Sequence, residues 1–393
     1  MGGFDAVPVP VEEFAARRRR ALDAAAAQGL AGLLVCGRGG GGLDRYGDIF
    51  YLTNHYTSFP FIPDVAGAWT SRAHSFLIMP VGDEPTLIVD LPYIEAVAMP
   101  RDRIVLADLV TEAAIEALQK TLSKGRIGLV SGDTLPMPVG KQIEAALPGI
   151  TFEPADNILM ALRSLKSPAE ISQLKAASKL GSRAIDAMME AAIPGATHGD
   201  VVAAAMSVIV PAGGALYNSF MASGRGGANP TLTRCSFPTW GAKQPLSDGE
   251  WFRVGLSGVL NGYCFDLARA RPVGKPVAEQ IPAFEAAISV VEAGIAAMKP
   301  GATAADVARA GLKTQEEAGF AWKGVFSGLG HGLGLGWDAP WLTPDENAVI
   351  KPGMVMCIEK TLMRDGWLGD FEETVVIEDD GPHLITDARR RYW

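Results

Sequence analysis

Four acidic residues and one histidine in the C-terminal half of the sequence have the types and the settings of metal ligands. Asp266 and Glu359 each end an apolar segment, and Glu372 and Glu373 begin another. A carboxylate inside an apolar strand costs free energy unless it is paired or binds a metal ion. His331 lies in a glycine-rich segment, where the backbone can come close to a ligand. One imidazole and three of these carboxylates together form the nitrogen and oxygen donor set that a divalent cation prefers.

The same residues also fit a network of salt bridges. Arg269 follows Asp266 by three residues and could neutralise that carboxylate without any metal ion. The residue types alone leave both interpretations open, because a buried carboxylate is satisfied equally well by an arginine or by a cation.

The composition limits the partners of this chain. A length of 393 residues predicts two domains. The formal net charge of -9 argues against a nucleic-acid partner, because phosphate binding needs a basic surface. The 4 cysteines show no metal or redox spacing, and neither a secretory leader nor a membrane-spanning apolar run is evident. We therefore expect a cytoplasmic protein that acts on a small-molecule substrate away from membranes.

The order of the expected elements indicates two different domain types. Residues 11–28 are typical of an amphipathic helix, and apolar strand-like runs with a helix between them follow up to residue 130. This pattern predicts an α/β domain over residues 1–160. A long helix then begins after Ser167, which can cap it together with Glu170 in a capping box. We place the second domain at residues 161–393.

An internal repeat divides the second domain. The sequence Pro-Gly-Ala-Thr begins at Pro194 and again at Pro300, and Asp200 and Asp306 stand at the same place after it. In each copy Pro-Gly ends one helix, Thr caps the next, and the aspartate lies near the positive helix end. Duplication with a pseudo-twofold relation is the expected origin. We expect His198, which lies in the first of these turns, to be exposed.

Four motifs of the second domain, in this order, resemble those of the pita-bread superfamily of aminopeptidase P, methionine aminopeptidase and creatinase. They are Gly262-Tyr-Cys-Phe-Asp-Leu-Ala-Arg269, Gly330-His-Gly-Leu-Gly334, Gly353-Met-Val-Met-Cys-Ile-Glu359 and Phe371-Glu-Glu373. Tyr51-Leu-Thr53 and the segment 162–170 are similar to further segments of creatinase-like proteins. The resemblance implies a creatinase-like α/β domain, an α+β pita-bread domain with a pseudo-twofold repeat, and a homodimer.

The resemblance also implies which residues bind metal. Asp266, His331, Glu359 and Glu372 match ligand positions, and Glu373 matches a residue that orients a ligand. The superfamily has a further aspartate eleven residues before the first of these, where this chain has Gly255. That aspartate serves only one of two metal ions in its relatives. We therefore expect one divalent metal ion per subunit, Mn²⁺, Fe²⁺ or Zn²⁺.

Two histidines that the related peptidases use for proton transfer have no counterpart here. One position falls within 336–340 and the other is Ala228, before Asn229 and Pro230. We expect the catalytic residues to be His331, Glu359 as a base and Asp338 in place of a missing histidine.

Three residues are expected to bind substrate: Arg225, Trp337 and Arg269, the arginines through paired hydrogen bonds to a carboxylate. The predicted function is hydrolysis of a small C–N bonded substrate, such as a dipeptide, an amide or an amidine-like compound. Two alternatives remain. One is a metal-dependent lyase acting on a small carboxylate such as dimethylsulfoniopropionate, and the other is a non-catalytic binding protein on the same scaffold.

Overall fold

The chain divides into two compact units. The computed structural model describes residues 4–39, 46–57, 59–60, 62–226, 241–320 and 328–393, and the backbone of 231–234. One unit is Val9–Arg163, and the other contains Ser164–Trp393 with the segment that ends at Pro8. That segment is held by the helix Pro168–Ala191, since the Val7 amide donates to Ser172 Oγ at 2.9 Å. The sequence-based division at residues 160 and 161 differs by three residues and assigned this segment to the other domain.

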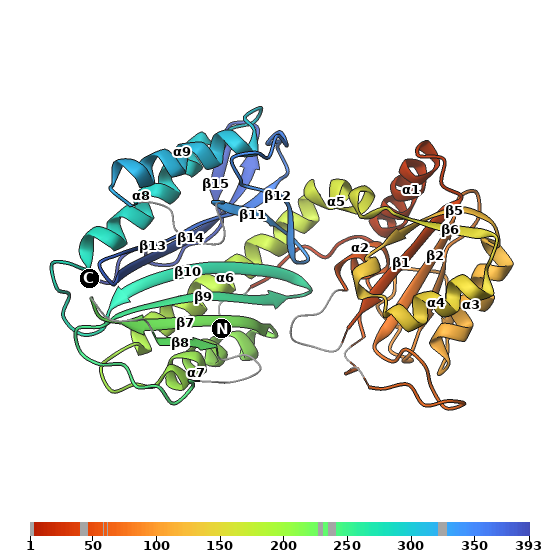
Figure 1. Ribbon diagram of the computed structural model, residues 1–393, viewed down its shortest axis with the longest axis horizontal. Coiled ribbons are helices and arrows are strands. Elements are labelled where there is room, and N and C mark those ends of the chain that lie inside the picture. The colour runs from red at the N-terminus through yellow and green to blue at the C-terminus, as the bar shows by residue number, and fades with distance from the viewer. Residues whose placement is uncertain are drawn as a thin grey trace. The chain divides into compact units, whose positions relative to one another are not determined.

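The first unit is an α/β domain around a mixed sheet (Figure 1). Its elements are α1 (Val11–Ala27), β1 (Gly32–Arg38), α2 (Gly47–Thr53), β2 (His74–Pro80), β3 (Thr86–Val89), η1 (Arg101–Arg103), β4 (Ile104–Leu106), α3 (Val110–Thr121), β5 (Gly125–Val130), η2 (Gly132–Thr134), α4 (Met137–Ala146), β6 (Ile150–Pro154) and α5 (Asp156–Ser164). The strand order is β4-β3-β2-β1-β5-β6. Strand β1 pairs antiparallel with β2 and parallel with β5.

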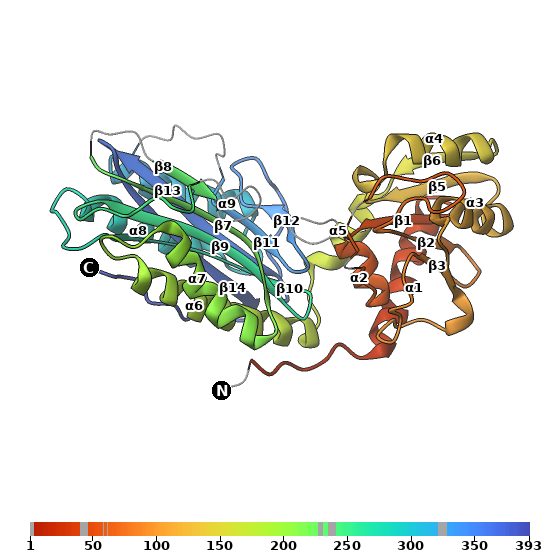
Figure 2. The same cartoon turned by 90° about the horizontal axis from the view of Figure 1, so that it is seen from below.

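The second unit is built on one antiparallel sheet with two helix pairs (Figure 2). Its helices are α6 (Pro168–Ala191), α7 (His198–Ile209), η3 (Val210–Ala212), α8 (Ile281–Ala297) and α9 (Ala304–Glu317). Its strands are β7 (Ala215–Gly224), β8 (Thr231–Arg234), β9 (Trp251–Leu260), β10 (Tyr263–Pro272), β11 (Gly330–Leu333), β12 (Trp337–Trp341), β13 (Val355–Arg364), β14 (Trp367–Glu378) and β15 (Gly381–Leu384). The order is β12-β11-β13-β14-β10-β9-β7-β8, with β15 paired to β14.

Each helix pair covers one half of this sheet. Helices α6 and α7 share an apolar core with β9 and β10, and α8 and α9 share another with β13 and β14. The predicted repeat is visible in the hydrogen bonds of the two turns. The Gly195 amide donates to Leu246 O at 2.8 Å, and the Gly301 amide donates to Ile350 O at 2.9 Å. Both following helices begin with a complete capping box. The pseudo-twofold relation is therefore built into the backbone.

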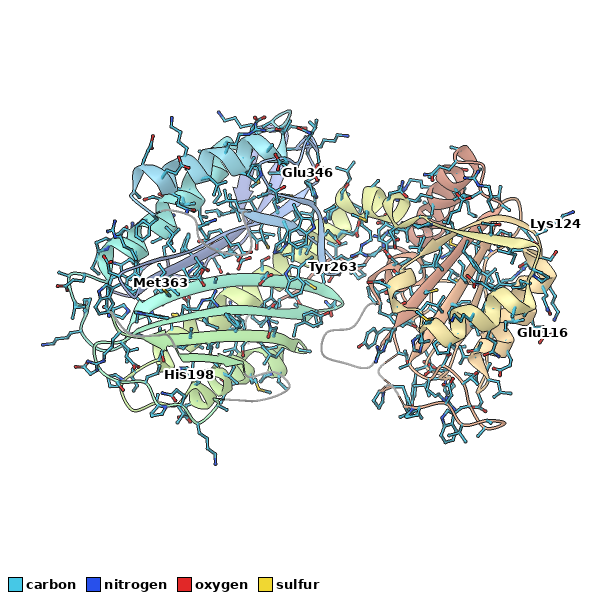
Figure 3. All side chains as sticks on the ribbon, viewed as in Figure 1. Glu116, Lys124, His198, Tyr263, Glu346 and Met363 are labelled. Carbon is cyan, nitrogen blue, oxygen red and sulfur yellow. The ribbon has the colours of Figure 1, made fainter. Side chains whose placement is uncertain are left out.

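His198 is buried, so the expectation of an exposed turn residue was wrong (Figure 3). It is the first residue of α7, and its ring lies 5.6 Å from the Phe252 ring on β9. The His198 amide donates to Gln244 O at 2.9 Å, which holds the turn against the loop before β9. The Pro-Gly-Ala-Thr turn packs inward, and the sequence pattern does not reveal this packing.

We expect burial of His198 to make the unit sensitive to acid. Burial lowers the pKa of His198 from 6.5 to about 4. Between these values the unfolded chain binds more protons than the folded one, so stability falls as the pH drops from 6.5 to 4. His198→Gln should remove about 1–3 kcal/mol of this pH-dependent loss. Unfolding free energies at pH 7 and pH 4.5 test it, with exposed His383→Gln as the control. An unchanged pH dependence in His198→Gln would contradict this prediction.

Candidate metal centre

Strand alternation places the acidic residues on the sheet face away from the helices. On β10, Phe265 and Leu267 lie against Gly181 of α6, so Asp266 between them points the other way. On β13, Ile358 lies against Gly294 of α8, so Glu359 also points away from the helices. The apolar neighbours that made these carboxylates conspicuous in the sequence are therefore the residues that anchor each strand to its helix.

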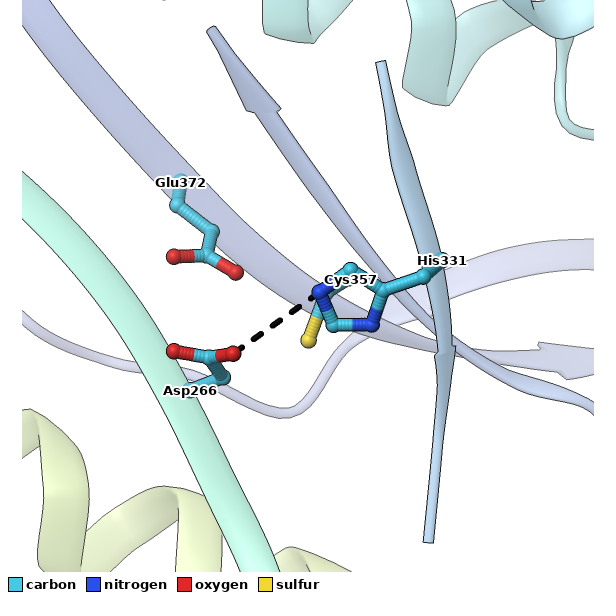
Figure 4. A group of neighbouring side chains, drawn as sticks. All are labelled: Asp266, His331, Cys357 and Glu372. Atoms are coloured by element: carbon cyan, nitrogen blue, oxygen red, sulfur yellow. Dashed lines mark ion pairs between the residues drawn. The ribbon is translucent and has the colours of Figure 1, made fainter. Parts of the chain in front are cut away.

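Four side chains meet on this open face: Asp266, His331, Cys357 and Glu372 (Figure 4). Each offers a ligand atom, and these atoms all lie within 4.8 Å of one another. All four residues are buried. His331 Nε2 lies 3.7 Å from Asp266 Oδ2. The structure thus brings together three of the four predicted ligands and adds Cys357, which the sequence analysis left without a role.

The orientation of His331 leaves one ring nitrogen for a ligand. Its Nδ1 lies 2.9 Å from the Gly332 carbonyl oxygen, so the proton belongs on Nδ1 and the lone pair of Nε2 faces Asp266. Gly330, just before it, has φ 147°, and a Cβ there would collide with the Cys357 carbonyl oxygen. Only glycine allows β11 to pair this closely with β13.

Glu359 lies beside this cluster and is not one of the four mutually close residues. It faces Glu372 directly across the β13–β14 pair and is half-buried. Burial raises the pKa of Glu359 to about 7, the Asp370 carboxylate raises it further, and Arg253 and Lys360 oppose the rise.

The electrostatics of the cluster favour a bound cation. Burial raises the pKa of Asp266 to about 6, against the opposing effects of His331 and of the Trp337 hydrogen bond. Burial and the neighbouring carboxylates, Asp266 first, raise the pKa of Glu372 well above its usual range. Among the described residues, Glu372 Oε1 is buried and has no hydrogen-bond partner. A divalent cation would offset this repulsion and use that oxygen, so the residues present fit a metal ion.

Arg269 does not neutralise Asp266 and has no free surface for a substrate. It is fully buried, and its guanidinium donates to Glu373 Oε1 at 2.9 Å and to Arg389 O at 2.8 Å. Glu373 also accepts a hydrogen bond from the Thr386 hydroxyl. Arg269 therefore fixes the residue next to Glu372, and we do not carry its predicted substrate-binding role forward.

Asp338 forms a buried ion pair, and its role in proton transfer stays a prediction. Its Oδ2 lies 3.4 Å from Lys166 Nζ, and both side chains are buried. The Lys166 backbone amide donates to Gly353 O at 2.9 Å, which ties the segment before α6 to the turn before β13. We assign this ion pair to the packing of β12 against the segment before α6.

Trp337 does lie at the cluster, together with two aromatic residues that the sequence analysis missed. The Trp337 indole N–H donates to Asp266 Oδ2, and its ring is 43% exposed. The Trp341 ring lies 5.2 Å from the His331 ring, and the Tyr217 ring lies 6.1 Å from the Trp337 ring. We call Tyr217, Trp337 and Trp341 the aromatic wall. Nothing in the sequence pattern indicates it, because it depends on a register shift between His331 and Gly332.

Arg225 lies at the other end of β7 from Tyr217. Its guanidinium donates to the Asp248 carbonyl oxygen. Arg225 directly follows Gly224, the last residue of β7, which pairs with Trp251 at the start of β9. Asp266 by contrast pairs with Ser257, far along the same strand β9. The structure thus does not place Arg225 at the cluster. Ala228, which stands where a catalytic histidine was sought, lies outside the described residues.

Family models match both units. The model of metallopeptidase family M24 matches residues 172–380, which is more than half of the chain. The chain belongs to metallopeptidase family M24. The creatinase/prolidase N-terminal domain matches residues 17–165. The predicted pita-bread superfamily and both domain types are thereby confirmed, and the M24 chain is a metallohydrolase of the kind that uses divalent metal ions.

Two of the named relatives of this M24 chain are dipeptidases. The probable dipeptidase PepE of Mycobacterium tuberculosis is 26% identical over 338 residues, covering 81% of this chain and 86% of the relative. The Xaa-Pro dipeptidase of Pyrococcus furiosus is 26% identical over 244 residues, covering 61% and 68%. The solved prolidase of Thermococcus sibiricus shares the fold, with TM-score 0.78, 20% identity, and coverage of 96% and 98%. In the part of the M24 chain that the structure describes, no helix is long and apolar enough to cross a membrane.

We expect Trp337→Phe to weaken metal binding by the M24 chain. The indole N–H is a hydrogen-bond donor to Asp266 that stabilises the ionised carboxylate, so its loss raises the pKa of Asp266 further. Loss of such a partner typically weakens metal affinity about 10–100-fold. Titration calorimetry with Mn²⁺ measures the change. Trp341→Phe, which keeps the ring contact with His331 and lacks any described bond to Asp266, is the matched control. Equal affinities of the two variants would contradict the prediction.

Proposed function

We propose that this chain hydrolyses a small C–N bonded substrate, with a dipeptide as the preferred class, using one divalent metal ion per subunit. The observation that carries the proposal is the buried group Asp266, His331 and Glu372, in which Glu372 Oε1 has no described partner. Glu359 completes the ligand set from its place opposite Glu372. The names of the dipeptidase relatives support the substrate class.

The chain's own residues have distinct parts in this proposal. A divalent cation would polarise a substrate carbonyl and lower the pKa of water. His331 holds its Nε2 toward the cation through the Gly332 contact, and Trp337 keeps Asp266 ionised. Glu359 accepts a proton from water, because it is the half-buried carboxylate of the site. The aromatic wall excludes water from one side of the substrate.

The metal is one of Mn²⁺, Fe²⁺ and Zn²⁺, and the two side chains that could supply the fourth ligand distinguish them. Glu359 adds a third carboxylate and favours Mn²⁺, whereas the Cys357 thiol favours Zn²⁺ or Fe²⁺. Glu359→Gln and Cys357→Ser, each titrated with Mn²⁺ and Zn²⁺, separate the choices. Our proposal expects the larger loss of affinity in Glu359→Gln with both ions.

The test of the function is a product assay on the purified full chain. The protein is treated with a chelator, reloaded with each metal, and given Xaa-Pro and other dipeptides. Free amino acids should form only when metal is bound, and their formation should stop when the chelator is added. An unsaturated acid formed from dimethylsulfoniopropionate without water uptake would support the lyase instead. Metal binding with no turnover of any substrate would support a binding protein.

We also propose that the protein is a homodimer in the cytoplasm. Sedimentation velocity tests the oligomeric state, and cell fractionation tests the location.

A further inference from the structure

Arg253 brings a permanent positive charge onto the carboxylate-rich face of the sheet. It lies on β9, where Ala270 pairs with it and Ala268 pairs with Gly255. Because Ala268 and Ala270 share a face with Asp266, Arg253 and Gly255 point toward that same face. Arg253 is buried, with its guanidinium 5.0 Å from the centre of the Phe220 ring. A fixed cation therefore lies on the face that holds the proposed metal ligands.

The partner of this guanidinium is Asp370. Both Nε, at 2.7 Å, and Nη2 of Arg253 contact Asp370 Oδ2. The other carboxylate oxygen of Asp370 accepts a hydrogen bond from Thr361 Oγ1 at 2.7 Å. Arg253 Nη1 donates to Phe220 O at 3.1 Å. Both oxygens of Asp370 are thus engaged, Oδ2 by two donors of Arg253 and Oδ1 by the Thr361 hydroxyl.

Gly255 leaves a space that opens onto the same guanidinium. Among the described residues, the only atoms within 4 Å of a Cβ built there are Arg253 Nη2 at 3.8 Å and Nη1 at 4.0 Å. An added side chain would fit without a collision and would reach the guanidinium first. Gly255, which stands where the superfamily has a further aspartate, thus faces the positively charged guanidinium of Arg253.

The charges on this face fall into two groups. The face carries four carboxylates, those of Asp266, Glu359, Asp370 and Glu372. Glu359 lies directly across from Glu372, and Asp370 stands two residues before Glu372 on the same face of β14. One metal ion would neutralise Asp266 and Glu372, and the Arg253 guanidinium neutralises Asp370.

We propose that Arg253, held by Asp370, occupies the place of a second metal ion and limits this chain to one. The inference rests on the proposed metal site. A guanidinium repels a divalent cation and takes up the carboxylate that such a cation would need. Gly255 alone is not the reason for a single ion, because restoring an aspartate there would give Arg253 another partner.

The experiment measures metal content by elemental analysis after reloading the full chain with Mn²⁺ and desalting. Wild type and Gly255→Asp should each hold about one ion per chain, and Arg253→Ser combined with Gly255→Asp about two. Arg271→Ser combined with Gly255→Asp is the matched control and should hold about one, because Arg271 bonds carbonyls away from the cluster. A second ion in Gly255→Asp alone, or only one in the folded Arg253 double variant, would overturn the inference. Wild type without any ion would instead refute the proposed metal site, and this inference with it.

A second measurement needs no arginine replacement. In the metal-free chain, Gly255→Asp adds an ion pair with Arg253, whereas Gly255→Asn adds a side chain of the same shape without the charge. The melting temperature of Gly255→Asp should therefore exceed that of Gly255→Asn, and 1 M salt should reduce the difference. A lower melting temperature for the aspartate variant, restored by Mn²⁺, would show that Arg253 does not act as the cation there.

Discussion

Asp266→Ala and His331→Ala are each expected to lose the bound metal ion and the hydrolytic activity together. The two side chains lie on different strands, and their ligand atoms are 3.7 Å apart in a buried cluster. Replacement of an outer partner of a metal ligand already costs about 10–100-fold in affinity, so removal of a ligand itself should cost more than about 100-fold. Elemental analysis and Mn²⁺ titration measure the loss, and dipeptide hydrolysis should fall below about 1% of wild type.

The same chain offers a matched control for this experiment. Asp380 and His383 form an exposed pair 2.7 Å apart, close to Glu378, with the same residue types as the buried pair. Asp380→Ala and His383→Ala should leave metal content and activity unchanged, because water solvates this pair and no buried repulsion needs a cation. Metal content that survives in His331→Ala, or falls in His383→Ala, would place the ion elsewhere. Asp266→Asn, which keeps the size of the side chain, separates metal loss from misfolding.

Local sequence signals were sufficient for much of the fold. The capping box at Ser167 and Glu170 is present in the structure, and so are those of the two repeat turns. Such caps are readable because donor and acceptor lie within four residues of each other. Strand alternation was equally readable, and it turned Asp266 away from Phe265 and Leu267. The same alternation indicates Cys357 beside Glu359 and Asp370 beside Glu372, a signal that the sequence analysis did not use.

The missed features depend on contacts between distant segments. Asp338 contacts Lys166, which is 172 residues away in the sequence, and no local pattern indicates this pair. Trp341 reaches His331 only because β11 and β12 shift register between His331 and Gly332. His198 is buried because the loop before β9 closes over its turn. Periodicity reports the face of an element, and these three outcomes depend on which element lies opposite.

Arg269→Met is expected to cost the second unit about 3–5 kcal/mol of stability. Methionine fills a similar volume but leaves the Glu373 carboxylate buried without its charge partner and removes the donors to Arg389 O and Glu372 O. Removing one partner of a buried ion pair costs more stability than the pair contributes, because the remaining charge is uncompensated. Seven of the 8 tryptophans follow residue 163, so tryptophan fluorescence during urea unfolding of the full chain reports mainly on this unit.

Arg391→Met tests whether the burial of Arg269, and not arginine loss as such, causes the effect. Arg391 forms a paired contact with Glu285, but the two side chains are 48% and 37% exposed. Its replacement should cost less than about 1 kcal/mol, because water solvates both charges after the change. The stability cost of Glu373→Gln should lie between those of Arg269→Met and Arg391→Met. The amide oxygen still accepts a hydrogen bond from Arg269, but the negative charge is lost. Equal unfolding midpoints for Arg269→Met and Arg391→Met would mean that Arg269 does not hold the strand that carries Glu372.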